Sequence, residues 1–83
     1  MTDNYLYYRQ QATDLVEPHV FKYKQYRCVD LVVAKSLLGD EYYDRMMADK
    51  IKNLGPKPGT IYPWNVIDYL SFRLQDAGNE DIS

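Results

Sequence analysis

The segment from His19 to Leu38, HVFKYKQYRCVDLVVAKSLL, decides the fold of this chain. Its second half, from Leu31 onward, is apolar on nearly every side of a helical wheel. That distribution is typical of a central helix buried against several neighbours. Gly39 follows directly, and glycine is the residue most often found just after a helix C-terminus. The second half therefore predicts a buried central helix that ends at Leu38.

The first half of the segment has a less regular pattern. Phe21 and Tyr23 alternate with lysines, as they would in a strand, and the basic residues would be scattered around a helix. Pro18 precedes the segment, however, and proline suits the first turn of a helix. We therefore predict one continuous helix over residues 19–38, with an extended segment over residues 19–27 as the alternative.

Three other helices are predicted over residues 3–16, 41–54 and 63–77, because apolar residues recur on one face of each. Pro63 suits the start of the last helix, and we expect that helix to stop before Gly78. Four helices with short connections make a small compact bundle. The predicted fold class is therefore all-α.

Glycine and proline also set the predicted boundaries of the domain. The stretch Gly55-Pro56-Lys57-Pro58-Gly59 forms a stiff loop before the last helix, and Gly55 is expected to close the helix before it. A chain of 83 residues has room for one hydrophobic core. We therefore predict a single helical domain over residues 1–78 and an acidic, frayed C-terminal tail over residues 79–83.

The composition limits the classes of protein to consider. Lysine and arginine together number 10 against 12 acidic residues, a net charge of -2, whereas proteins that bind bulk DNA usually carry a positive excess. No apolar run approaches the length of a membrane span, and the first residues lack the pattern of a secretory signal. A single cysteine, Cys28, fits a reducing compartment. We therefore expect a small acidic cytoplasmic protein without a membrane segment.

Catalytic and metal-binding motifs find little support in the chain. His19 and Cys28 are the only histidine and cysteine, and on one continuous helix they would point in opposite directions. One residue of each kind cannot form a structural zinc site. The sequence also has no Gly-x-Ser-x-Gly elbow and no glycine-rich phosphate-binding motif. We therefore expect no enzyme activity, no metal and no cofactor.

Basic and aromatic side chains interleave over the segment His19–Arg27. Residues 18–38 contain three lysines, one arginine and one aspartate, so they have a local net charge of +3. Aromatic rings beside cations suit single-stranded nucleic acid, a nucleotide or an acidic protein. The candidate contacts for a phosphate or nucleic acid are Lys22, Tyr23, Lys24, Tyr26 and Arg27. The competing interpretation is that the rings pack inward while the charges face solvent.

Several aromatic residues fall outside the apolar faces of the predicted helices. Tyr7 lies opposite the apolar face of the first helix, and Tyr69 and Phe72 project away from that of the last. Large aromatic side chains are enriched in protein interfaces. These three residues are the predicted partner-binding site. A burial of the last helix on both sides is the competing interpretation.

Together these patterns predict a small protein that works by binding another macromolecule. We expect a non-enzymatic protein-binding module, a regulator or inhibitor that docks on a larger protein and can self-associate into a homo-oligomer. The alternative is nucleic-acid or nucleotide binding through residues 19–27. Salt dependence separates the two classes, since phosphate binding weakens steeply as salt rises.

Overall fold

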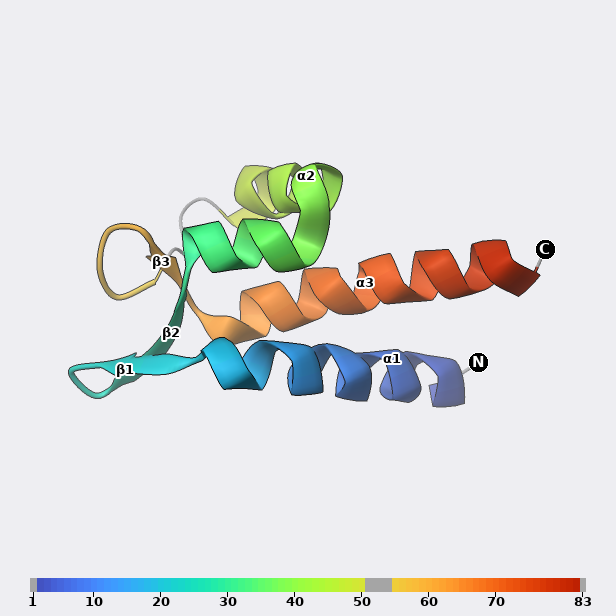
Figure 1. Cartoon of the computed structure of the whole chain (residues 1–83), viewed down its shortest axis with the longest axis horizontal. Helices are drawn as coiled ribbons and strands as arrows, with labels where there is room; N and C mark the ends of the chain where they lie inside the picture. Colours follow the sequence, from blue (N-terminus) through green and yellow to red (C-terminus); the bar gives the residue numbers. More distant parts are fainter. Residues whose placement is uncertain (1, 51–54, 83) are drawn as a thin grey trace.

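The computed structural model describes residues 2–50 and 55–82 (Figure 1). The helices in these residues are α1 (Thr2–Val16), α2 (Leu31–Lys50) and α3 (Pro63–Ile82), with a 3-10 turn, η1 (Glu17–His19), after α1. The strands are β1 (Phe21–Tyr23), β2 (Tyr26–Asp30) and β3 (Thr60–Ile61). The strands form one antiparallel sheet in the order β1-β2-β3. The fold is therefore a mixed α/β fold, and the prediction of an all-α helical bundle is wrong.

A β-hairpin occupies residues 21–30, so the predicted continuous helix over residues 19–38 is wrong as well. Tyr23 pairs with Tyr26 across a two-residue turn, and Phe21 pairs with Cys28. Aromatic and β-branched residues favour strands because they fit a pleated surface. Alternation places Phe21 and Tyr23 on one face of the hairpin, whereas a helix would separate them. Strand pairing therefore prevails over the helix-compatible position of the preceding proline.

The Pro/Gly loop leads into the third strand. Ile61 pairs with Val29 and Thr60 pairs with Asp30, which makes β2 the central strand of the sheet. Main-chain hydrogen bonds from Gly55 N to the carbonyl of Thr60 and from Thr60 N to that of Lys57 close the loop, and Leu31 N at the start of α2 donates to the carbonyl of Gly59. The segment predicted as a simple helix connection therefore also ties the sheet together.

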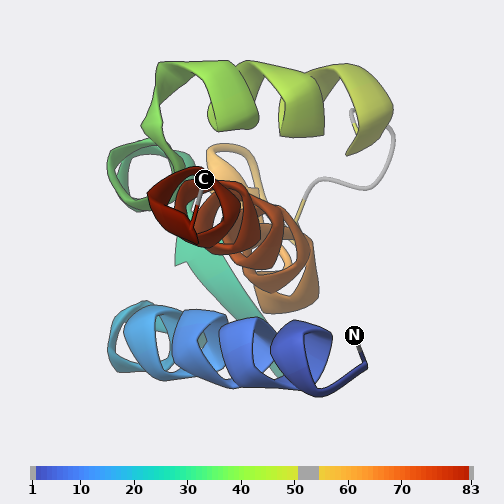
Figure 2. The ribbon, with the colours of Figure 1, turned by 90° about the vertical axis from the view of Figure 1, so that its right-hand side faces the viewer.

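The helix α2 consists of two helical segments that meet at Gly39. This glycine has a φ of 81° and a ψ of 165°, which no helix interior allows. A positive φ is accessible to glycine at low cost. Figure 2 shows the second segment of α2 turned away from the first. The predicted helix end at Gly39 and the new helix after it are confirmed as far as Lys50. Residues 51–54, where the predicted helix end before Gly55 falls, lie outside the described part.

The first and last helices agree with prediction at all but one of their described ends. The first was predicted over residues 3–16 and spans Thr2–Val16, and the last begins at Pro63 as expected. The last helix does not stop before Gly78 but continues to Ile82. A Cβ at Gly78 would lie 2.0 Å from the hydroxyl oxygen of Tyr8. Gly78 therefore makes room for a ring from α1 and does not end the helix.

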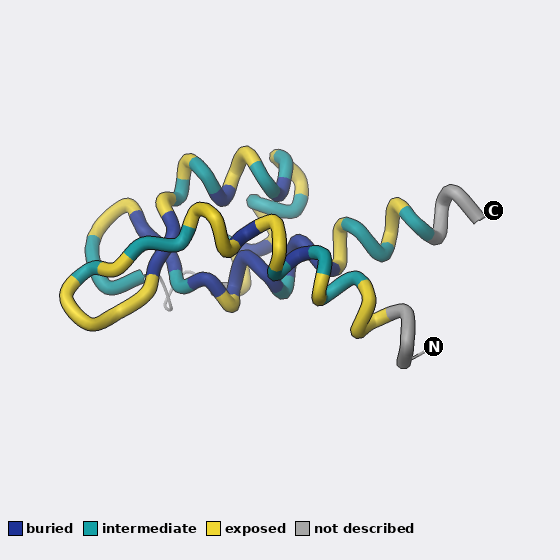
Figure 3. The backbone as a smooth tube through the Cα atoms, turned by 60° about the horizontal axis from the view of Figure 1, so that its bottom comes forward, coloured by how far each residue is buried: buried dark blue, intermediate teal, exposed yellow. Residues whose placement is uncertain are grey.

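The hydrophobic core forms on both sides of α3. This helix lies between α1 and α2 (Figure 2), so α3 is the central helix, and the prediction that residues 31–38 form it is wrong. Figure 3 shows that buried positions gather where the helices meet the sheet, whereas the tip of the hairpin is exposed. The buried core includes Ala12, Val16, Val29, Ala34, Leu38, Met46, Ile61, Val66, Ile67, Tyr69 and Leu70.

Candidate protein-binding face

The three predicted partner-binding residues occupy different environments. Tyr7 is 59% exposed on α1, where its hydroxyl accepts a hydrogen bond from Gln11. Phe72 is 44% exposed on α3. Tyr69 is only 8% exposed and belongs to the core, so the expectation that it projects away from the apolar face is wrong. The burial of α3 on two sides, which α1 and α2 provide, explains this difference.

Tyr69 nevertheless supports the surface from beneath. Its hydroxyl donates a hydrogen bond to the carboxylate of Asp49 on α2. Burial, together with this hydrogen bond, raises the pKa of Tyr69 to about 12. The ring contacts Phe72 edge to face, with centroids 5.6 Å apart. Tyr69 therefore fixes the position of Phe72 without itself offering much surface to a partner.

Exposed rings line one side of α3. Trp64, Asp68 and Phe72 recur every four residues and so share a face of the helix. Trp64 is 54% exposed, although its position in the sequence predicts a place on the buried side. Its ring stacks on that of Tyr62, with centroids 4.5 Å apart and an interplanar angle of 7°. The spacing of four residues from Trp64 to Asp68 to Phe72 was the one pattern in the sequence that could have predicted this face.

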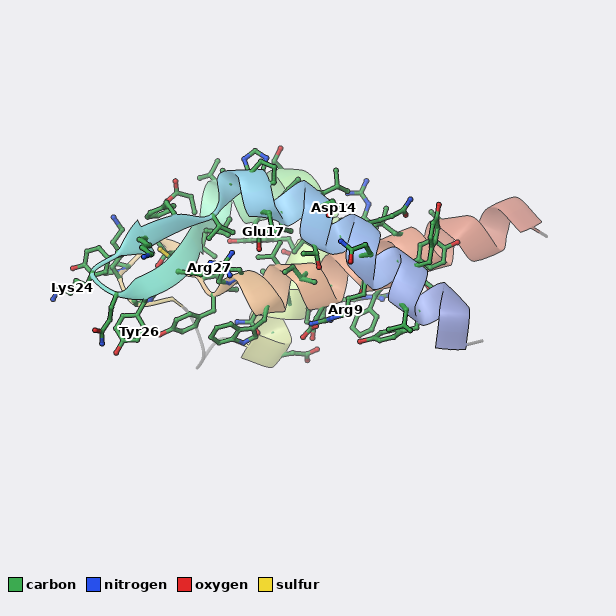
Figure 4. All side chains as sticks on the ribbon, turned by 90° about the horizontal axis from the view of Figure 1, so that it is seen from below. Arg9, Asp14, Glu17, Lys24, Tyr26 and Arg27 are labelled. Carbon is green, nitrogen blue, oxygen red and sulfur yellow. The ribbon has the colours of Figure 1, made fainter. Side chains whose placement is uncertain are left out.

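An ion pair connects this side of α3 to α1. Nη1 of Arg9 donates to Asp68 at 2.5 Å, and this hydrogen bond raises the pKa of Arg9. Figure 4 shows Arg9 on α1 on the side facing α3. Tyr5, 41% exposed, lies one helical turn before Arg9. The helices α1 and α3 run in opposite directions (Figure 1), and the phenol of Tyr5 is close enough to the Arg9 guanidinium to contribute to its raised pKa. We call Tyr5, Tyr62, Trp64 and Phe72, with the Arg9–Asp68 pair between them, the aromatic face.

The basic and aromatic residues of the hairpin divide between its two faces. Lys22 is directly opposite Arg27 on one face, while Tyr23 is opposite Tyr26 on the other. Arg27 donates two hydrogen bonds to the carboxylate of Glu17, at 2.7 and 2.6 Å, so its charge is already paired. Figure 4 shows Lys24 and Tyr26 at the hairpin tip and Arg27 beside Glu17. The five predicted phosphate contacts therefore do not form one continuous surface.

Lys57 is a residue that sequence reasoning missed. It belongs to the Pro/Gly loop, and its ammonium group lies 5.5 Å from the ring centroid of Phe21 and 5.1 Å from that of Tyr23. Lys24 places its own ammonium group 5.6 Å from the Tyr23 centroid. No local pattern connects position 57 to positions 21 and 23. Pairing of β3 with β2 brings the loop to the hairpin.

The geometric argument that separated His19 from Cys28 does not apply to the structure, since a hairpin replaces the continuous helix. Cys28 is fully buried on β2, whereas His19 is exposed at the end of η1. Among the described residues, no group of three or more histidine, cysteine or acidic side chains is placed to hold a metal ion. Within the same residues, no helix is long and apolar enough to cross a membrane.

A shallow pocket of about 250 Å³ lies between α2 and α3. Its polar groups already have partners within the protein. The Tyr42 hydroxyl donates to Asp76, which is the main reason that the pKa of Tyr42 is raised, and Arg73 donates to the carbonyl of Leu37. The pocket therefore reflects contacts between two helices and presents few unpaired polar groups to a ligand.

The chain matches no protein-family model, no curated protein and no solved structure. Only the arrangement of its own residues therefore indicates a function.

Proposed function

We propose that this chain is a small non-enzymatic protein-binding module that docks on another protein through the aromatic face. The observation that supports this proposal most directly is the joint exposure of Trp64 and Phe72 on one side of α3, together with that of Tyr5 on α1. A monomer gains nothing from leaving such large rings in water, since burial of one aromatic side chain contributes about 1.5–3 kcal/mol. A protein surface that covers them would recover that free energy.

The kinds of side chain present also support a protein partner. Residues that contribute most to binding at protein interfaces are enriched in tryptophan, tyrosine and arginine. The aromatic face contains a tryptophan, tyrosines and the Arg9–Asp68 pair, whose side chains are each 35% exposed. Stacking on Tyr62 and the edge contact from Tyr69 hold Trp64 and Phe72 in place before binding. Such ordering in advance lowers the entropy lost on association.

The role that this proposal fits is a regulator or inhibitor that covers part of a larger protein. A second copy of the same chain is the other form that a protein partner can take. A symmetric dimer would place the same face of each copy against the other, so one set of rings would serve both. Sedimentation of the purified protein distinguishes these two cases, because only self-association depends on the concentration of this chain alone.

Site-specific photo-crosslinking in the producing cell tests the proposal. A benzophenone amino acid replaces Trp64 or Phe72, and in a matched control it replaces Val32, which is 82% exposed on α2. We expect discrete adducts from positions 64 and 72 and none from position 32. An adduct of twice the chain mass identifies a second copy, and another mass identifies a different protein. Equal adducts at all three positions, or none at any, would contradict the proposal.

A further inference from the structure

Two lysines from distant parts of the chain meet at one tyrosine ring. The ammonium groups of Lys24 and Lys57 lie 5.6 and 5.1 Å from the ring centroid of Tyr23, and Lys57 also lies 5.5 Å from that of Phe21. We call Phe21, Tyr23, Lys24 and Lys57 the lysine–tyrosine cluster. The attraction between a cation and the face of a ring holds both charges near the hairpin tip.

These two lysines have no carboxylate partner among the side chains that the structure describes. The ion pairs found there each use an arginine, and they are Arg9–Asp68, Arg27–Glu17 and Arg45–Glu41. Two cations held at one ring repel each other, and the attraction of an anion bound beside them would offset that repulsion. The cluster is therefore a local positive site on a chain whose net charge is -2.

The backbone of Lys24 has a conformation that is unfavourable for a residue with a side chain. Lys24 has a φ of 57° at the first position of the two-residue turn between β1 and β2. Glycine takes this conformation freely, whereas a side chain such as lysine costs about 1 kcal/mol there. Strained residues of this kind often occur at binding sites, where the side chain matters more than the strain. A lysine at this turn thus contributes a charge at some expense of stability.

We propose that the lysine–tyrosine cluster binds an acidic segment of the protein partner, a step that rests on the proposed function above. Lys24 and Lys57 pair with carboxylates of that segment, and Tyr26, 47% exposed on the same hairpin face as Tyr23, packs against its apolar atoms. Charged contacts of this type select a partner and speed its association more than they raise affinity. The aromatic face supplies affinity, and the cluster supplies charge complementarity.

An acidic protein segment suits the cluster better than a nucleic acid does. Tight binding to a phosphate backbone needs many cationic contacts along the strand. Here Arg27 is bound to Glu17, and Lys22 is on the opposite face of the hairpin from Tyr23. Two lysines are sufficient for a short acidic peptide, whereas an extended polyanion would meet the acidic remainder of the molecule.

Titration of the ¹⁵N-labelled full chain with a decaglutamate peptide, followed by NMR, tests this inference. We expect peak shifts confined to residues 21–26 and 57, and weaker binding as salt rises. The double variant K24E/K57E should lose about tenfold or more in affinity, since two attractive charges become repulsive. The matched control is K35E, because Lys35 also lies over a tyrosine ring, Tyr43, at 5.7 Å, and within the described residues no second lysine lies over that ring. K35E should bind the peptide within about twofold of the original chain.

The variant K24G separates binding from folding. Glycine relieves the positive φ, so K24G should unfold at an equal or higher urea concentration while binding the peptide about threefold more weakly. Equal loss of affinity in K35E and K24E/K57E would overturn the inference, as would shifts spread over the whole chain. A ten-residue oligo(dT) that binds the cluster more tightly than decaglutamate would overturn it in favour of nucleic acid.

Failure of this inference is distinguishable from failure of the proposed function. The peptide titration uses only the purified chain, whereas the crosslinks at positions 64 and 72 report a protein partner. Crosslinks at positions 64 and 72 without peptide binding would contradict the inference of an acidic segment and leave the proposed function intact. Peptide binding at the hairpin without any crosslink would contradict docking through the aromatic face. The peptide could then no longer be taken to represent a segment of a protein partner.

Discussion

Arg73 on α3 donates a hydrogen bond from Nη1 to the main-chain carbonyl of Leu37, 2.6 Å away. The last carbonyls of a helical segment lack partners within the helix, and a basic side chain can satisfy one of them. Leu37 lies just before the break at Gly39, where the first segment of α2 ends. One guanidinium therefore joins the central helix to the point at which α2 changes direction.

Replacement of Arg73 by methionine should destabilise the protein while keeping most of the packing of its aliphatic stem. We expect a loss of about 1 kcal/mol in the free energy of unfolding, typical of one hydrogen bond. Urea denaturation followed by circular dichroism measures it. A loss that Arg73→Lys restores only in part would support the planar guanidinium as the capping group. No loss in R73M would show that water caps Leu37 equally well.

Gly39→Ala should destabilise through backbone conformation and not through a clash. A Cβ at position 39 would lie 3.5 Å from Nη1 of Arg73, an ordinary contact, but alanine does not adopt a φ of 81° without strain. We expect a loss of about 1–2 kcal/mol in the free energy of unfolding. A thermal or urea transition measures this loss, with Ala48→Gly on the exposed side of α2 as a comparison for glycine–alanine exchange within a helix. An unchanged free energy of unfolding in G39A would contradict the positive φ at position 39.

Tyr69→Phe should change how stability depends on alkaline pH. The pKa of Tyr69 is about 12 in the folded protein against an ordinary 10.0, so the folded state holds the phenolic proton more tightly than the unfolded state does. The resulting stabilisation is complete below pH 10.0 and is lost as pH rises towards about 12. Urea denaturation at pH 9, 10 and 11 (about one unit apart, around the unfolded pKa) measures the free energy of unfolding. As pH rises, this free energy should decrease less in Y69F than in the original chain.

The same substitution has an effect at neutral pH. Loss of the hydrogen bond to Asp49 should cost about 1 kcal/mol, because Asp49 is exposed and water can replace the phenol. Absorbance at alkaline pH provides an independent check, since Y69F should remove a tyrosine whose pKa is raised to about 12. Identical pH profiles for the two proteins would show that Tyr69 is not buried as described.

The Arg27–Glu17 pair should contribute little to stability despite its two hydrogen bonds. Its side chains are 52% and 47% exposed, and water screens charges at such positions. A double-mutant cycle with E17Q, R27Q and both together should give a coupling free energy below about 1 kcal/mol, which decreases further in high salt. A coupling free energy well above that value would contradict this prediction. It would mean that the ion pair is shielded from solvent and holds the Arg27 side chain in place.

Local chemistry was sufficient to predict the parts of the fold that depend on near neighbours. The helix before Pro18, the break at Gly39 and the helix start at Pro63 all follow from residues within one or two turns. The hairpin also had a local signal, the alternation of Phe21 and Tyr23 with lysines, but Pro18, which suits the first turn of a helix, favoured one helix through the whole segment. Two competing periodicities over residues 19–27 could not be resolved without knowledge of strand pairing.

The sheet and both candidate binding surfaces depend on contacts between segments far apart in the chain. Thr60 and Ile61 form a strand only because β2 lies beside them, and a two-residue strand has no periodicity of its own. Trp64 is exposed and Tyr69 is buried because α1 and α2 cover two particular sides of α3, a choice that helical periodicity alone leaves open. Lys57 reaches Tyr23 by the same long-range pairing. Side-chain patterns thus defined which residues were available for binding, and packing between distant elements selected the ones that remain at the surface.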